Sequence, residues 1–245
     1  PPRRWFRDRR GSARCAGALP IPLNAAYWDR WRWIVDRAAE RGLHVVLVYG
    51  EPGRLENPWK CATTAACYEY GRRVGGTFRD KATVVFCNGQ DSDANGGVGA
   101  AGWRAMAEGV ADGVNGVSAF DGSADYSTTL MTYHGYSIYE TFQKDAWIDF
   151  YGQEVWHNNA AVYDTVNRGY NLTDPVKPIV FLEGSYEDEQ AFITPWYVRV
   201  EAWHAVFAGS AGYGYGHYNN WSQTASVAYL GDTAAGQMGV LAAFF

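Results

Sequence analysis

Two acidic residues in this chain each follow an apolar run that has the composition of a buried strand. Asp91 follows the run at 84–87, and Glu183 follows the run at 178–182. Burying a carboxylate is costly unless the group is paired or used in chemistry. In a parallel α/β barrel the C-terminal strand ends form the active-site face. Two carboxylates that reach this face from different strands could cleave a glycosidic bond, one as acid/base and one as nucleophile.

Both acids have a structural alternative, because acidic residues after strands are often helix N-caps or loop residues. Each also has a rival nearby. Asp93 lies just beyond Asp91, and Glu187 lies beyond the end of the strand that leads to Glu183. We rank Glu187 below Glu183 because of that position.

Other polar and aromatic residues fall near expected strand ends and are candidates for substrate binding. His134, Gln153 and His217 could hydrogen-bond sugar hydroxyls or orient the acids, or could be structural polar residues with satisfied hydrogen bonds. Tyr49 follows the first visible strand and could line the cleft. Trp221 could stack on a sugar ring, although an ordinary packed tryptophan explains it nearly as well.

The composition favours a folded, carbohydrate-directed protein. The 245 residues are 47% hydrophobic and only 19% charged, and the formal net charge is −5. That charge disfavours nucleic acid as the partner. The 11 Trp, 17 Tyr and 11 Phe provide aromatic faces that can stack on sugar rings. No run of apolar residues is long enough for a membrane helix, so no membrane partner is expected.

No metal or cofactor is expected from the motifs. The histidines are scattered without an HExxH pattern, and no cysteine pair has zinc-ligand spacing. The segment 97–102 matches a dinucleotide fingerprint in letters but does not open directly from a strand. The segment 209–212 suggests a serine elbow but lacks its first glycine. Cys61 and Cys67 could form a local disulfide or simply share a helical turn.

The N-terminus has no apolar signal region, so the localisation is unknown. A secreted or periplasmic location is favoured, with any signal peptide not present in this chain.

Strand-like and helix-like segments alternate, which is typical of parallel α/β folds. An irregular segment at 1–22 precedes them. We expect one domain over 1–245, of the TIM (β/α)8-barrel type. About six β/α units are visible instead of eight, which predicts a barrel that is incomplete at its N-terminal end. The expected strands lie at 43–49, 82–87, 128–133, 147–151, 178–182 and 211–215, and the expected helices at 24–42, 63–79, 103–110, 159–168, 196–207 and 233–245.

From Asn24 to the C-terminus, the order and spacing of several motifs resemble those of the apiosidase-like family of glycoside hydrolases. The motifs are Tyr70-Gly71-Arg72, Phe78-Arg79-Asp80, Gly89-Gln90-Asp91, Trp103 to Gly109, Leu130 to His134, Trp147 to Phe150, Glu183 with Tyr186-Glu187, Val206 to Gly212, and Tyr215-Gly216-His217 with Trp221.

The resemblance implies a retaining (β/α)8-barrel enzyme in which Glu183 is the nucleophile and Asp91 is the acid/base. Asp91 must then keep a raised pKa in the free enzyme, through burial or the charge of Glu183. Asn88 and Tyr186, which lie close to the two acids in sequence, are further candidates for substrate binding.

The chain departs from the family in two respects. The family has Gly-Gly-Asp and Gly-Glu-Pro where this chain has Gly89-Gln90-Asp91 and Leu182-Glu183-Gly184, so the substrate is open. The family's first two strand–helix units have no counterpart here. An open barrel exposes strand edges, and we expect residues 1–22, a second chain through self-association, or unusual packing to cover the gap.

The expected function is that of a retaining glycoside hydrolase acting on plant-type polysaccharide or oligosaccharide. The alternatives are a catalytically inactive carbohydrate-binding protein on a truncated barrel, and a fragment that functions only in a larger assembly.

Overall fold

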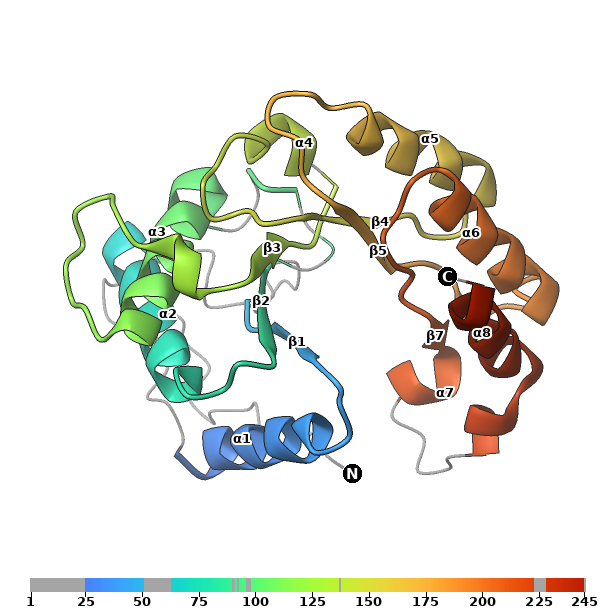
Figure 1. Ribbon diagram of the computed structural model, residues 1–245, viewed down its shortest axis with the longest axis horizontal. Coiled ribbons are helices and arrows are strands. Elements are labelled where there is room, and N and C mark those ends of the chain that lie inside the picture. Colours follow the sequence, from blue (N-terminus) through green and yellow to red (C-terminus); the bar gives the residue numbers. More distant parts are fainter. Residues whose placement is uncertain are drawn as a thin grey trace, which may run out of the picture.

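The computed structural model describes residues 25–50, 63–89, 91, 93–95, 98–136, 138–222 and 228–244. In these residues strands and helices alternate as predicted, and the helices form a curved wall outside the strands (Figure 1). The strands are β1 Val45–Val48, β2 Val84–Asn88, β3 Met131–Tyr133, β4 Tyr151–Glu154, β5 Ile179–Glu183, β6 Tyr186–Glu187 and β7 Gly216–His217. The α-helices are α1 Ala25–Ala39, α2 Thr64–Phe78, α3 Gly99–Asn115, α4 Ile138–Thr141, α5 Asn159–Tyr170, α6 Pro195–Phe207, α7 Tyr218–Trp221 and α8 Thr233–Phe244.

The first five strands follow one another as a parallel arc in chain order. β1 pairs with β2, β2 with β3, and β4 with β5. An isolated parallel bridge between His134 and Gly152 joins β3 to β4, and another joins Phe181 of β5 to Tyr213. The short strands β6 and β7 pair with each other. Because the arc is parallel, the C-terminal strand ends lie on one side of it.

The joint between β3 and β4 combines side-chain hydrogen bonds with a few backbone contacts, among them the bond from the Asp149 amide to the Met131 carbonyl at 2.9 Å. The Thr132 hydroxyl donates to the Phe150 carbonyl (2.7 Å) and accepts from the Gly152 amide (3.1 Å). The Asp149 carboxylate accepts from the Met131 amide at 2.6 Å. These bonds connect the β1–β3 block to the β4–β5 block.

Three of the predicted strands differ from the structure. Residues 147–150 form turns, because Trp147 and Ile148 fill the core instead of continuing a sheet, and β4 begins only at Tyr151. The segment predicted at 128–133 begins as a 3-10 turn that Asp125 caps, which leaves β3 as a short strand. The segment at 211–215 runs beside β5, to which the Ala211 and Gly214 amides donate at 2.7 Å each, but it forms only an isolated bridge at Tyr213, and β7 comes after it.

Helices α2 and α3 touch backbone to backbone through glycines. A Cβ atom on Gly71 would lie 2.1 Å from the Met106 carbonyl oxygen, and one on Gly109 would lie 2.0 Å from that of Tyr68. Real Cβ atoms do not approach other atoms so closely, so only glycine fits at this spacing. Since α2 precedes β2 and α3 follows it, this contact fixes the two helices that flank the strand leading to Asp91.

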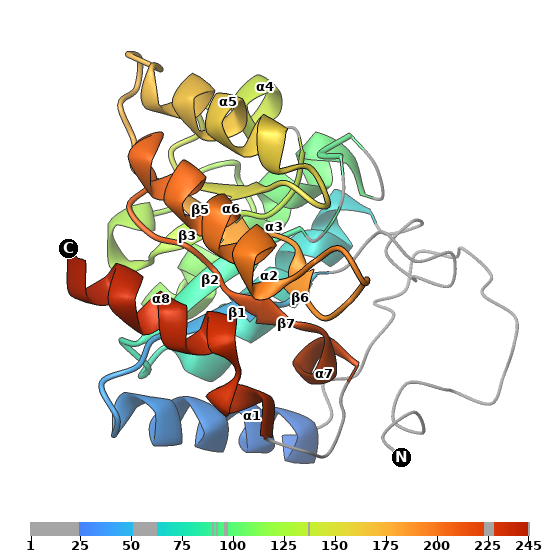
Figure 2. The same cartoon turned by 90° about the vertical axis from the view of Figure 1, so that its right-hand side faces the viewer.

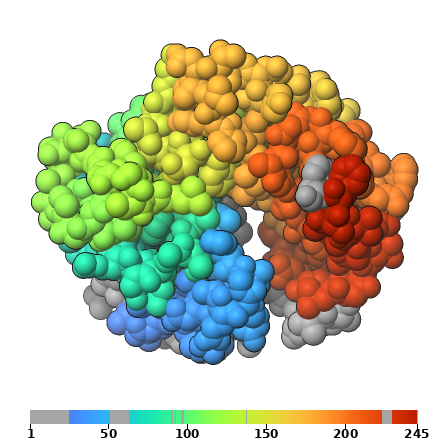
Figure 3. All heavy atoms as spheres, viewed as in Figure 1, coloured from blue at the N-terminus to red at the C-terminus, as the bar shows by residue number. Residues whose placement is uncertain are grey.

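The arc does not close into a ring within the described residues. In the part of the chain that the structure describes, no strand pairs with the outer edge of β1, and Val46 and Val48 are 43% and 41% exposed. Figure 3 shows an opening between the N-terminal part in blue and the C-terminal part in red. Figure 2 shows α5, α6 and α8 side by side on the outside of the C-terminal part. The absence of two β/α units stays a prediction, and residues 1–22, a candidate cover for the gap, lie outside the described residues.

Two further points concern cysteines and membranes. Cys67 and Cys87 are free, buried thiols, while Cys15 and Cys61 lie outside the described residues. None of the helices described combines the length and apolar character that crossing a bilayer requires.

Candidate active site

Four polar side chains from successive strand ends meet on one side of the arc. Asp91 follows β2, His134 follows β3, and Glu154 and Glu183 are the last residues of β4 and β5. One nitrogen or oxygen atom from each lies within 4.8 Å of those of the others. The two acids singled out in the sequence are thus brought together, although 92 positions separate Asp91 from Glu183. We call this group the acid cluster.

His134 is the hub of the acid cluster. Its Nε2 atom lies 2.9 Å from Glu154 Oε2 and 3.4 Å from Glu183 Oε2, and its Nδ1 atom lies 4.0 Å from Asp91 Oδ1. Burial of the ring opposes a positive charge, but the hydrogen bond and the charge of Glu154, with those of Glu183 and Asp91, raise the pKa of His134 above its usual value. A protonated His134 therefore offsets part of the negative charge of the carboxylates.

Asp91 has the character of a proton donor. Partial burial, followed by the charges of Glu183 and Glu154, raises the pKa of Asp91 to about 6. Its side chain is still 55% exposed, so solvent reaches it. The backbone at Asp91 has φ of 45°, in the left-handed region that aspartate tolerates better than most residues. An acid with this pKa is well matched to general acid/base catalysis near neutral pH.

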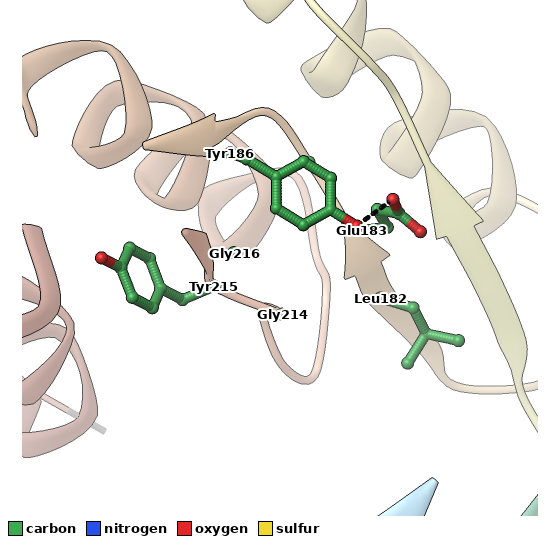
Figure 4. Close-up of a pocket in the computed structure, with 7 residues that line it drawn as sticks. Leu182, Glu183, Tyr186, Gly214, Tyr215 and Gly216 are labelled. Atoms are coloured by element: carbon green, nitrogen blue, oxygen red, sulfur yellow. Dashed lines mark hydrogen bonds between the residues drawn. The ribbon is translucent and has the colours of Figure 1, made fainter. Parts of the chain in front are cut away.

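Glu183 is held by a tyrosine from the next strand. The Tyr186 hydroxyl donates a short hydrogen bond to Glu183 Oε1 (Figure 4). Burial raises the pKa of Glu183, while the Tyr186 bond and the His134 charge act in the opposite direction. A pocket of about 80 Å³ adjoins these two residues and is otherwise lined by Leu182, Gly184, Gly214, Tyr215 and Gly216.

A second buried carboxylate supports the turn after Glu183. Glu201 of α6 is fully buried and accepts hydrogen bonds from the Ser185 amide (2.9 Å), the Ser185 hydroxyl (3.1 Å) and the Tyr213 hydroxyl (2.9 Å). Burial outweighs these bonds and raises the pKa of Glu201 to about 7. A Cβ atom on Gly184 would lie 2.2 Å from Glu201 Oε2, which explains the glycine after Glu183.

Glu154 is the residue of the acid cluster that the sequence does not single out. The sequence points to its neighbour Gln153 instead, but Gln153 is buried and its amide donates to the Gly152 carbonyl at 3.2 Å. The available signal was that Glu154, like Glu183, is an acidic residue at the end of a strand. Glu154 Oε1 is buried and has no hydrogen-bond partner among the described residues.

Asn88, Tyr49 and Trp221 differ in how accessible they are. Asn88, the last residue of β2, is fully buried, and both polar atoms of its amide group lack a partner in the described part of the chain. Tyr49 is a core residue whose hydroxyl likewise has no described partner. Trp221 is 53% exposed, and its ring centroid lies 6.4 Å from that of Tyr186.

His217 belongs to a different cluster. Its Nε2 atom lies 3.0 Å from Asp232 Oδ2 and 3.7 Å from Asp188 Oδ2, and its Nδ1 atom accepts from the Asn219 amide at 3.1 Å. A neutral imidazole that accepts at Nδ1 carries its proton on Nε2, so His217 donates to Asp232. This geometry gives His217 a structural role in tying α7 to the segment before α8.

The two rival acids lie outside the acid cluster. Asp93 is exposed and accepts from the Asn95 amide at 2.7 Å, which is a turn contact. Glu187 is buried and accepts from the Tyr215 hydroxyl and, at 3.4 Å, from the Ala234 amide.

Two groups of side chains have donor sets that a divalent cation could use. The acid cluster offers three carboxylates and one imidazole, and the Asp188–His217–Asp232 group offers two carboxylates and one imidazole. In both groups the histidine already contacts its carboxylates directly.

The glycine-rich segment 97–102 has its first residue outside the described residues, and its other residues lead into α3. In the segment 209–212, which suggested a serine elbow, the Ser210 hydroxyl donates to the Gly212 carbonyl at 2.6 Å.

Comparison with solved structures places this fold among glycosidases. A glycoside hydrolase family 5 structure from Bacteroides vulgatus superposes with a TM-score of 0.70 at 20% identity, over 90% of this chain and 53% of that chain. A second structure, described as a glycoside hydrolase, gives a TM-score of 0.70 at 20% identity, over 91% of this chain and 56% of that chain. A β-D-glucuronidase from Dictyoglomus thermophilum gives a TM-score of 0.52 at 11% identity, over 76% of this chain and 36% of that chain.

At these identities the likeness concerns the fold alone, which is of the TIM-barrel type predicted from the alternating segments. The chain spans about half the length of the first two structures. No curated protein sequence matches the chain.

The sequence profile of the apiosidase-like catalytic domain matches residues 8–245, nearly the whole chain. This confirms the resemblance found in the motifs, and together with the glycosidase neighbours it supports a glycoside hydrolase. The chain belongs to the apiosidase-like catalytic-domain family.

Proposed function

We propose that the chain is a retaining glycoside hydrolase, with Glu183 as the nucleophile and Asp91 as the acid/base. The observation that carries the proposal is the approach of their carboxylate oxygens to within 4.8 Å. Retaining enzymes separate their two carboxyl groups by about 5–5.5 Å, whereas inverting enzymes leave about 6.5–9.5 Å for a water molecule. The short separation favours the retaining class.

In the first step, a carboxylate oxygen of Glu183 attacks the anomeric carbon while the bond to the leaving oxygen breaks. Protonated Asp91 gives its proton to that oxygen, so the leaving alcohol departs neutral and a glycosyl ester forms on Glu183. The raised pKa of Asp91, about 6, supports this role because a share of Asp91 stays protonated at mildly acidic pH, where an ordinary aspartate is almost fully ionised.

In the second step, Asp91 takes a proton from water as the water oxygen attacks the anomeric carbon. The ester to Glu183 breaks, which restores the Glu183 carboxylate and protonated Asp91 and retains the configuration of the sugar. Two partners steady Glu183 throughout. Tyr186 donates to one of its oxygens, and His134 lies 3.4 Å from the other.

Glu154 and Asn88 are proposed to bind substrate or to orient the cluster. Glu154 Oε1 and the Asn88 amide are buried and lack described partners, and sugar hydroxyls can both donate and accept hydrogen bonds. We propose a plant-type polysaccharide or oligosaccharide as the substrate.

The decisive experiment is a screen of polysaccharides and aryl-glycosides, with the anomer of the first product followed by NMR. Retention of configuration, with activity lost in Glu183→Gln, is the expected result. Inversion, or full activity in Glu183→Gln, would overturn the assignment. Glu187→Gln is the matched control, because Glu187 lies on β6 outside the acid cluster.

A carbohydrate-binding protein without turnover is the second candidate. The opening between the N-terminal and C-terminal parts favours it, because catalysis needs the acids held in a closed and stable geometry (Figure 3). Saturable binding of a polysaccharide without release of any product would select this candidate over the enzyme.

A further inference from the structure

Trp156 is an exposed aromatic residue that follows closely in sequence on Glu154 of the acid cluster. It lies two positions after Glu154, and its neighbours are tied to the strand end that carries Glu183. The Val155 amide donates to the Glu183 carbonyl at 3.2 Å, and the His157 amide donates to the Ser185 hydroxyl at 3.1 Å. Two residues of extended chain span at most about 7 Å, so the Trp156 Cα lies within that distance of the Glu154 Cα.

The ring of Trp156 is held in place by the protein. Its Nε1–H donates to Glu189 Oε2 at 3.1 Å, and His157 Nε2 lies 2.9 Å from the same oxygen. The Gln190 amide lies 3.2 Å from His157 Nδ1, which completes a chain of hydrogen bonds. The centroids of the Trp156 and His157 rings are 4.0 Å apart. The only polar atom of the indole is therefore satisfied internally.

Despite these contacts, 54% of Trp156 is exposed, and Phe192, whose ring lies 5.7 Å from that of His157, is 50% exposed. Two other exposed tryptophans differ from it. Trp33 carries the Arg30 guanidinium 4.1 Å from its ring centroid, and Trp196 carries that of Arg199 at 4.4 Å. No such cation covers Trp156 among the described residues. Its free surface is apolar, flat and fixed.

We propose that Trp156 forms a stacking subsite for a sugar ring next to the ring that reacts at Glu183. This inference rests on the proposed function and deepens it, because it makes the substrate a chain of at least two sugar units. The apolar C–H face of a sugar packs on an indole face, and a ring that is already fixed loses little freedom when the ligand binds. Trp221, whose ring centroid lies 6.4 Å from that of Tyr186, is a second exposed aromatic residue near Glu183.

The test uses the full chain with Glu183→Gln, which allows binding without cleavage. Isothermal titration calorimetry with mono-, di- and trisaccharides of the sugar found in the screen measures the affinity. Adding Trp156→Ala should weaken trisaccharide binding about tenfold, with a smaller loss for the monosaccharide. Trp156→Phe, which keeps a flat ring, should recover most of the affinity even though the bond to Glu189 is lost.

Trp33→Ala and Trp196→Ala are matched controls, since both remove an exposed tryptophan that an arginine covers. They should bind like the parent. Equal trisaccharide affinity with and without Trp156, in proteins with unchanged near-ultraviolet circular dichroism, would overturn the subsite while leaving the glycosidase proposal intact. If no carbohydrate binds to the parent at all, both proposals are overturned.

Discussion

Replacing Glu154 with glutamine should lower the pKa of Asp91 by about one unit. The substitution keeps the size of the side chain and removes one negative charge from the acid cluster. The charge of Glu154 is one of the causes that raise the pKa of Asp91 to about 6. The loss of that charge makes the Asp91 proton easier to remove, so the pKa of Asp91 falls.

The magnitude follows from the distance. The cluster places the interacting atoms within 4.8 Å. Two unit charges at about that distance interact by about 0.9 kcal/mol in water and by about 3.5 kcal/mol at an effective dielectric constant of about 20. The Asp91 side chain is 55% exposed, so solvent screening places the value near the lower limit. About 1–1.5 kcal/mol corresponds to about one pKa unit.

The assay is a carbon-13 NMR titration of protein labelled at the aspartate carboxyl carbon. Asp91→Asn identifies the Asp91 signal by its disappearance. The midpoint should move from about 6 to about 5 in Glu154→Gln. Glu140→Gln removes an exposed carboxylate that pairs with Arg168 on the outer surface, and should leave the midpoint in place. An unchanged or raised Asp91 midpoint in Glu154→Gln would refute this account of the cluster.

Three further predictions concern stability and metal dependence. Gly109→Ala should lower the free energy of unfolding by about 3 kcal/mol or more in urea denaturation. Gly236→Ala is the control and should not lower it, because nothing lies within 4 Å of the new Cβ. Equal stability of the two variants would contradict the backbone contact between α2 and α3. The folded-state pKa of Glu201, about 7, lies above its ordinary value of 4.5, so the unfolding free energy of the wild type should fall as the pH rises from below 4.5 to above 7. The fall should be roughly 3 kcal/mol relative to Glu201→Gln. A constant difference in unfolding free energy between the two proteins across that range would refute this titration of Glu201. Hydrolysis should be unaffected by EDTA or by added Mg²⁺, Ca²⁺ or Zn²⁺, because the His134 imidazole already lies against the carboxylates of the acid cluster. Activation by a metal would count against the proposed mechanism.

The sequence predicted the order of the elements well because their signals are local. The run 84–87 is apolar throughout and forms the fully buried β2. Helical spacing placed Cys67, Gly71, Val74 and Phe78 on one face of a helix, and all four are buried in α2. A continuous apolar run predicts a strand that is buried on both faces, and apolar residues at helical spacing predict a helix with one buried face.

What the sequence could not resolve depends on contacts between distant segments. Trp147 and Ile148 have strand-like composition but serve as core residues in a turn. Gln153 and Glu154 are adjacent, and only the β3–β4 joint decides that Glu154 is the residue that reaches His134. His217 follows a predicted strand, like His134, yet its partners come from the segment before α8 and the loop after β6, which no local pattern predicts.

The Thr132 hydroxyl has a consequence for the acids that it does not touch. Asp91 belongs to the block of β1–β3 and Glu183 to that of β4–β5, and between the blocks this hydroxyl adds two bonds to the Asp149–Met131 bonds and the bridge between His134 and Gly152. The alignment of proton donor and nucleophile therefore depends on a small set of bonds, two of which belong to one rotatable side chain in the interior. Removal of this one buried oxygen atom can misalign the two acids and lower activity while every residue that contacts the substrate is kept.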